Sequence, residues 1–218
     1  MKKVILLFVV ILNLSCSPDK VSSGDGLSYF QFLPQDNDKF ITSTEVGKIL
    51  IYKNQNNDEL KFKVLKNTTE KQLESRDSFV VGSYKYFYYD EQRIQLGDIL
   101  EEPSQYYAYD SFFISIKRVP KVFQLSPTVI SSESQLVAVI GLRPFDNTDV
   151  AFLNYSEPLM TLTINSQVYT KVRKVTLPNN PYPHANATLK GLTSIYFDQN
   201  KGLIGFDDIQ NNQWRLQN

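Results

Sequence analysis

The sequence SIYFDQNKGLIGFDDIQNNQWRLQN, residues 194–218, decides the fold. Two short runs rich in aromatic and β-branched residues, SIYFD and LIGFDD, flank the tetrapeptide QNKG. Such runs are typical of β-strands, and Asn and Gly favour the tight turns that join them. A further turn, IQNN, leads to QWRLQN. The segment therefore predicts three consecutive antiparallel strands, a meander.

The same pattern continues toward the amino terminus. MTLTI (residues 160–164) turns at Asn165 and Ser166 into QVYTKVRKVTL, and KILIYK (48–53) turns at NQNND into ELKFKVLK (59–66). Apolar residues alternate with polar ones, and long helical stripes are missing. We expect an all-β chain with a single antiparallel domain of roughly ten strands, arranged as a sandwich or a curved half-barrel. Glu70 to Arg76 suits a short helix about as well as a strand.

The amino-terminal residues have the anatomy of an export signal. Lys2 and Lys3 precede an unbroken apolar run, Val4 to Leu12, which has the length of the hydrophobic region of a signal peptide. A membrane-spanning helix needs about 20 apolar residues, so a transmembrane anchor is disfavoured. The single cysteine of the chain, Cys16, follows shortly after this run.

The pair Ser15–Cys16 after this run resembles the lipobox of bacterial lipoproteins. The resemblance implies cleavage between Ser15 and Cys16, and attachment of lipid acyl chains to Cys16. Asn13 stands where the family usually has Leu. An ordinary secretory signal with a chance cysteine is the alternative, but a lone free thiol is unusual in an exported protein. Several acyl chains hold a protein stably on a membrane.

These features divide the chain into three parts. Residues 1–15 are the expected signal peptide, residues 16–26 the acylated cysteine and a flexible tether rich in Ser, Gly and Pro, and residues 27–218 the β domain. Without residues 1–15, 21 of the 23 basic side chains remain against 23 acidic ones. Nucleic-acid binding is not supported, because it calls for a basic excess.

A second resemblance lies in the last third of the chain. TLTINSQVYTKVRKVTL and SIYFDQNKGLIGFDD look like the closing segment of small, mostly uncharacterised β-rich lipoproteins common in the Bacteroidetes. The likeness covers Leu159 to Leu216. It implies a fold and a place in the envelope of a Gram-negative bacterium, most simply the outer membrane. It transfers no catalytic residue.

The sequence gives little support for a catalytic site or a zinc site. His184, the only histidine, lies in the loop sequence PYPHANA, and a solvated loop residue is the favoured interpretation. A serine hydrolase of the Gly-x-Ser-x-Gly type needs a motif that the sequence does not contain. One histidine and a lipidated cysteine cannot build the usual tetrahedral zinc site. We expect no cofactor and no metal.

Acidic clusters invite two further ideas. DNDK (Asp36 to Lys39), DNTD (Asp146 to Asp149) and DQNKG (Asp198 to Gly202) offer oxygen ligands for calcium, but none matches the D-x-[DN]-x-[DN]-G loop, and hairpin turns are the simpler interpretation. The pairs Glu101–Glu102 and Asp207–Asp208 suggest a glycosidase. Neighbouring residues of a strand point to opposite faces, so neither pair can share one site, and solvated turns are favoured.

The aromatic run SYKYFYYD (residues 83–90) offers a possible ligand face. Alternation places Tyr84, Tyr86 and Tyr88 on one side of a strand and Phe87 and Tyr89 on the other. Tyrosine hydroxyls need hydrogen-bond partners when buried, so we expect the first set to be more exposed. A core buried on both sides is the alternative.

The sequence therefore predicts a lipid-anchored, non-catalytic binding or assembly module of the cell envelope. Its expected partners are the membrane, through the lipid on Cys16, and an apolar ligand, a glycan or an envelope protein. The alternatives are a purely structural component of an envelope complex and a hydrolase that uses carboxylates.

Overall fold

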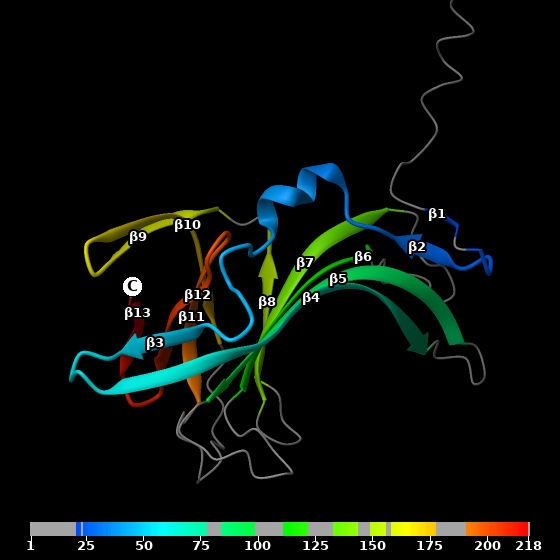
Figure 1. Cartoon of the computed structure of the whole chain (residues 1–218). Helices are drawn as coiled ribbons and strands as arrows, with labels where there is room; N and C mark the ends of the chain where they lie inside the picture. Colours follow the sequence, from blue (N-terminus) through cyan, green and yellow to red (C-terminus); the bar gives the residue numbers. More distant parts are fainter. Residues whose placement is uncertain are drawn as a thin grey trace, which may run out of the picture. The chain divides into compact units, whose positions relative to one another are not determined.

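The computed structural model describes residues 21–22, 24–77, 84–98, 111–121, 133–143, 149–155, 158–177 and 191–217 (Figure 1). Four predicted features lie outside these residues: the Ser15–Cys16 signal, the Glu101–Glu102 pair, His184, and most of the DNTD segment. For Tyr84 only the backbone is described.

The described residues form thirteen strands and one short 3₁₀ helix. In chain order they are β1 (Val21–Ser22), β2 (Ser28–Phe30), η1 (Pro34–Lys39), β3 (Ile49–Lys53), β4 (Glu59–Asp77), β5 (Tyr84–Asp98), β6 (Ser111–Pro120), β7 (Ser134–Arg143), β8 (Asp149–Asn154), β9 (Met160–Ile164), β10 (Gln167–Thr176), β11 (Leu192–Asp198), β12 (Gly202–Asp208) and β13 (Gln213–Gln217).

Eleven of these strands follow one another side by side in the order β8-β7-β6-β5-β4-β3-β13-β12-β11-β10-β9. The sheet is antiparallel along this path and does not close into a barrel. The short strand β2 pairs in parallel with β5 and antiparallel with β1. The prediction of an antiparallel all-β fold is confirmed.

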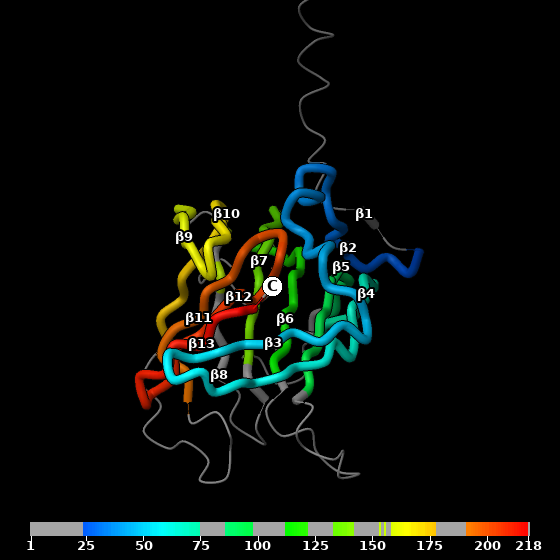
Figure 2. Tube along the Cα trace, turned by 60° about the vertical axis from the view of Figure 1, so that its left-hand side comes forward, coloured from blue at the N-terminus to red at the C-terminus, as the bar shows by residue number. Residues whose placement is uncertain are grey.

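The turns that the sequence predicted form the hairpins of the carboxyl-terminal meander (Figure 2). Asn165 and Ser166 both have positive φ angles, 49° and 67°, as a two-residue hairpin turn that matches strand twist requires. Gly202, at the end of QNKG, has a φ of 84°, which glycine adopts without the steric cost of a Cβ atom.

Two local expectations needed the structure to decide them. Glu70 to Arg76 continues strand β4 rather than forming a helix. The expected hairpin turn at Asp36 to Lys39 is wrong, because these residues belong to η1, where Pro34 supplies a preset φ at the first turn. A side-chain oxygen of Asp36 accepts a 2.8 Å hydrogen bond from the backbone nitrogen of Leu33 and fixes this turn.

The chain contains two compact units. Unit 1 comprises residues 1–31, 72–89 and 118–135, and unit 2 comprises residues 32–71, 90–117 and 136–218, as far as each is described. Strand periodicity does not reveal this division, because β4 to β7 each contribute residues to both units. β1 belongs to unit 1, so part of the segment expected to be a tether is paired with β2.

Each unit has its own core. In unit 1, the rings of Phe30 and Phe87 meet edge to face at 5.7 Å between centroids, and both side chains are fully buried. In unit 2, an aromatic cluster links strands far apart in sequence through Tyr52, Phe62, Phe112, Phe206 and Trp214. Within the described ranges, no helix is long and apolar enough to span a bilayer.

Candidate binding face on the carboxyl-terminal strands

A row of directly paired residues crosses five strands of unit 2. Residues that lie opposite each other in neighbouring strands point their side chains to the same face of a sheet. The register between β10 and β3 joins Lys174, Tyr196, Gly205, Arg215 and Lys53 in this way. Their side chains lie on the face opposite Phe206 and Trp214, which pack in the core of unit 2. Lys174 and Arg215 therefore lie on either side of the Tyr196 ring, and Lys53 lies next to Arg215 on the following strand.

Gly205 lets the Arg215 side chain cross β12. A Cβ atom at Gly205 would come within 2.7 Å of the Trp214 carbonyl oxygen and 3.1 Å of Arg215 Cδ. With only hydrogen there, Arg215 Nη1 donates to the carbonyl oxygens of Phe206 and Trp214, at 3.2 and 2.9 Å. The guanidinium carbon lies 4.5 Å from the centroid of the Tyr196 ring, a cation–π distance.

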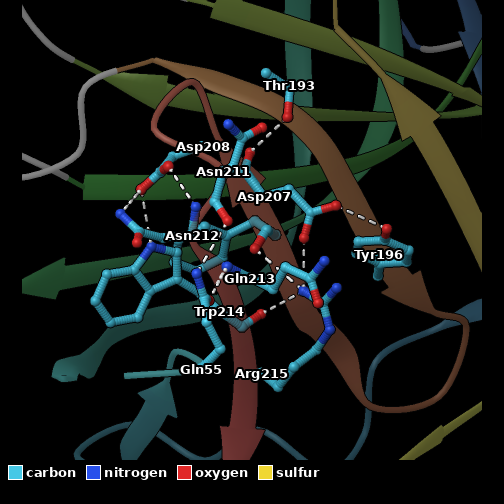
Figure 3. Close-up of polar contacts among 11 residues, drawn as sticks. Gln55, Thr193, Tyr196, Asp207, Asp208, Asn211, Asn212, Gln213, Trp214 and Arg215 are labelled. Carbon is cyan, nitrogen blue, oxygen red and sulfur yellow. Dashed lines mark hydrogen bonds and ion pairs between the residues drawn. The ribbon is translucent and has the colours of Figure 1, made fainter. Parts of the chain in front are cut away.

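Asp207 ties this pair together (Figure 3). Its carboxylate accepts hydrogen bonds from the Tyr196 hydroxyl and from Arg215 Nη1, both at 2.8 Å. Lys174 Nζ lies 5.3 Å from the centroid of the same tyrosine ring. Within the described part of the chain, Arg215 Nε and Nη2 make no hydrogen bond, and the side chain is 21% exposed.

Asp208 has a different role. Its carboxylate accepts hydrogen bonds from Trp214 Nε1 at 3.1 Å, from Asn212 Nδ2 at 2.9 Å, and from the backbone nitrogens of Gln210 and Asn212 (Figure 3). It closes the β12–β13 turn. The expectation that this carboxylate is solvated is wrong, because Asp208 is 4% exposed. Asp207 and Asp208 have separate partners, as opposite orientation predicts.

The cationic row continues onto β3 and β4. Lys53 pairs with Glu59 across the hairpin, and Ile51 and Ile49 pair with Lys61 and Lys63. Glu59 accepts from Lys53 at 2.9 Å and from Lys61 at 3.2 Å. Hydrogen bonding from Lys53, and then from Lys61, lowers the pKa of the Glu59 carboxyl. We name as the basic face the five cations on this side of unit 2: Lys53, Lys61, Lys63, Lys174 and Arg215.

The expected tyrosine face is described in part. Tyr86 is 46% exposed, whereas Phe87 is fully buried and Tyr89 nearly so. Tyr88 is half-buried, and its hydroxyl donates a 2.9 Å hydrogen bond to Asp25, which raises the pKa of the tyrosine. The exposure of Tyr86 and Phe87 follows the predicted order. A ligand on this side of β5 stays a prediction.

A second polar cluster lies within unit 2 around Arg173. Its Nη1 donates to the Gln199 side chain at 3.0 Å, its Nη2 donates to the Tyr155 carbonyl oxygen at 2.9 Å, and its guanidinium carbon lies 5.0 Å from the Tyr155 ring centroid. The Tyr155 hydroxyl is buried and has no hydrogen-bond partner among the described residues. Burial raises the pKa of Tyr155, and the charges of Asp36 and Asp38 add to this. Arg173 and Gln199 are 5% and 4% exposed, so these two side chains are enclosed.

The described acidic turns bind their own backbone. Asp198 Oδ1 accepts hydrogen bonds from the backbone nitrogens of Asn200 and Lys201, at 3.0 and 2.9 Å, which is ordinary turn chemistry. Asp149 begins strand β8, and the rest of DNTD lies outside the described residues. Where the structure describes the chain, no three His, Cys, Asp or Glu side chains are grouped as metal ligands would be.

Sequence reasoning did not find the basic face. Its members lie on four strands and come from three regions of the chain, residues 53–63, 174 and 215, and each alone is an ordinary charged strand residue. The signal present in the sequence was Gly205 within LIGFDD, since a glycine inside a strand marks a close approach of another group. Comparison with protein-family models, with curated proteins and with solved structures finds no match.

Proposed function

We propose that this protein is a lipid-anchored, non-catalytic binding module of the bacterial cell envelope, and that it recognises an anionic partner through the basic face. The anchor is Cys16, which follows Lys2, Lys3 and the apolar run Val4 to Leu12. An antiparallel β fold suits such a module, because a sheet presents long rows of side chains from one face.

The observation that carries the recognition role is the arrangement around Arg215. The contacts with Tyr196 and Asp207 hold the guanidinium in one orientation, and its Nε and Nη2 have no hydrogen-bond partner among the described residues. A preordered arginine loses less side-chain entropy when it binds an anion, and its planar donors match carboxylate and phosphate groups. Lys174 and Lys53 add positive charge on either side of it.

Labelling with fatty acid tests the anchor. Cys16→Ala should abolish incorporation of labelled fatty acid and should remove the mass of the acyl chains. Ser17→Ala is the matched control and should leave both unchanged. A Cys16→Ala protein with unchanged mass that still incorporates the label would overturn lipid attachment.

Binding to dextran sulfate, a soluble polyanion, tests the recognition role. Lys174→Gln with Arg215→Gln should lower the affinity for this probe, while Lys39→Gln with Lys201→Gln removes the same charge outside the basic face and should have little effect. Equal affinities of the two double variants would argue against an anion-binding face. Because Lys174 is exposed, Lys174→Gln alone tests the idea without disturbing the Arg215 contacts.

One observation favours a structural component as a second function. β9 lies at the end of the strand order, and its sequence MTLTI carries no charge. Leu159, Met160 and Val168 are exposed close to this edge. Uncharged edge strands offer backbone groups for pairing with another chain. Under this alternative, Val168→Glu should abolish co-purification with an envelope complex and leave dextran sulfate binding unchanged.

A further inference from the structure

The basic face carries a local excess of positive charge, although the whole chain has a net charge of zero. The chain contains 23 basic and 23 acidic residues. On the basic face, five cations are accompanied by two carboxylates in contact with them, Glu59 and Asp207. Lys63 and Lys174 are exposed, and Lys53 and Lys61 have side chains that are 38% and 42% exposed. The uneven distribution gives this side of unit 2 a local positive potential.

Exposed aliphatic side chains lie among these cations. Ile49 is 52% exposed and pairs with Lys63 across the β3–β4 hairpin. Leu65 is 45% exposed and lies two residues after Lys63, hence on the same face of β4. Lysine has an apolar stem that lies against such surface while its ammonium group stays in water.

We infer that the basic face docks unit 2 against the headgroups of an anionic lipid bilayer. This inference rests on the proposed function, because it assigns the anionic partner of the same face. Lipid phosphates complement the cations, and Ile49 and Leu65 reach toward the boundary between headgroups and acyl chains. A soluble polyanion offers only the first of these contacts.

The expected lipid on Cys16 lies close in sequence to the first strand, which would keep the folded chain near the membrane. Cys16 precedes Val21, the first residue of β1, by five residues. Five residues span at most about 18 Å when fully extended. The lipid would therefore hold the chain at the membrane surface, and the loss in entropy on docking is smaller than for a free protein.

Vesicle co-sedimentation of the full chain carrying Cys16→Ala tests the inference. One set of vesicles is phosphatidylcholine, and the other contains phosphatidylcholine with phosphatidylglycerol. The run Val4 to Leu12 contributes apolar binding to both sets, so the measured quantity is the ratio of the two partition coefficients. Lys61→Gln with Lys63→Gln should lower this ratio roughly ten- to thirty-fold, since each lysine near an anionic surface contributes about fivefold. The control pair Lys39→Gln with Lys201→Gln removes the same charge outside the basic face. Its partition ratio should stay closer to that of the parent protein than the ratio of the Lys61/Lys63 variant does.

A second variant separates a bilayer from a soluble polyanion. Ile49→Ser with Leu65→Ser should weaken binding to the anionic vesicles and leave dextran sulfate binding unchanged. Circular dichroism confirms that each variant is folded. Equal partition ratios of the Lys61/Lys63 and control variants would overturn the docking inference. Retained dextran sulfate binding in that case would leave the proposed function intact, and the fatty-acid labelling of Cys16→Ala is independent of both results.

Discussion

The guanidinium carbon of Arg215 lies 4.5 Å from the centre of the Tyr196 ring although the two residues are on strands β13 and β11, with β12 between them. Gly205 of β12 lies directly between them in the register. The absence of a Cβ atom there opens the path over which the arginine side chain reaches the ring. A small residue in one strand thus determines a contact between two others.

Gly205→Ala should destabilise the protein by about 1–3 kcal/mol, the usual cost of overpacking. The new methyl group would meet the Trp214 carbonyl oxygen at 2.7 Å, and a backbone atom cannot move aside as a flexible side chain can. Urea unfolding followed by the fluorescence of Trp214, the single tryptophan of the chain, measures the change.

Gly24→Ala is the control for this variant. A Cβ atom at Gly24 has no neighbour within 4 Å in the described structure, so its free energy of unfolding should stay within about 0.5 kcal/mol of the wild type. Equal unfolding midpoints of the two variants would contradict the close approach at Gly205.

Two tyrosines with buried hydroxyl groups should respond differently to loss of the hydroxyl. Tyr52 is fully buried, and its hydroxyl donates a 2.8 Å hydrogen bond to the Leu203 carbonyl oxygen. Tyr52→Phe leaves that oxygen without this donor and should cost about 1–3 kcal/mol. Tyr155→Phe removes a buried hydroxyl that has no hydrogen-bond partner in the described part of the chain, and should be neutral or stabilising. Thermal unfolding of both variants measures the difference, and a larger loss for Tyr155→Phe would refute it.

The two sides of β5 should differ in their sensitivity to truncation. Phe87 is fully buried against Phe30, and Phe87→Ala should cost about 3–5 kcal/mol. Tyr86 is 46% exposed, and Tyr86→Ala should cost far less. Melting temperatures measured side by side decide the matter. Similar collapse of both variants would mean that both sides of this stretch are core, and the tyrosine face would lose its support as a ligand site.

Glu59 should titrate below its usual pKa of 4.5, because Lys53 and Lys61 donate hydrogen bonds to the ionised carboxylate. A carboxyl whose pKa is lower in the folded state stabilises the fold above its unfolded pKa, and this contribution is lost as the pH falls through the folded value. The effect therefore lies below pH 4.5. NMR titration of the Glu59 carboxyl carbon measures the pKa.

Lys53→Gln should raise the pKa of Glu59 toward 4.5, since Lys53 is the largest cause of the shift. Lys66→Gln is the control, because Lys66 pairs with Glu70 and not with Glu59. An unchanged titration of Glu59 in the Lys53→Gln variant would show that this ion pair does not form in solution.

Which stretches form strands, and where the hairpins turn, could be read from local sequence. Alternation in ELKFKVLK and the dipeptide Asn165–Ser166 each act over a few neighbouring residues, and the structure has the strands and turns that they predict. Strands β1, β2 and β8 were not predicted. β1 and β2 have two and three residues, too few to show a period of two. The helix η1 was missed because aspartate, the residue type at position 36, is favoured both in turns and at the start of helices.

The candidate site was harder to foresee than the strands. Lys53 and Arg215 meet because β3 pairs with β13, and no property of either residue specifies that pairing. Asp207 and Asp208 look alike in sequence, yet one lies beside Arg215 and the other is buried under Trp214. Their difference depends on which face of β12 is covered.

The sequence by itself determined the all-β character, the carboxyl-terminal meander and the predicted lipid anchor at Cys16, because alternation, turn residues and export signals are local properties of the chain. Only the tertiary structure decided which cations share a face and which aromatic residues are core. On β5, burial falls on odd positions at Phe87 and Tyr89, which belong to unit 1, and on even positions at Ile94 and Leu96, which belong to unit 2. The physical reason is that a strand fixes only the two directions in which its side chains point, whereas burial depends on what other parts of the chain pack against each side.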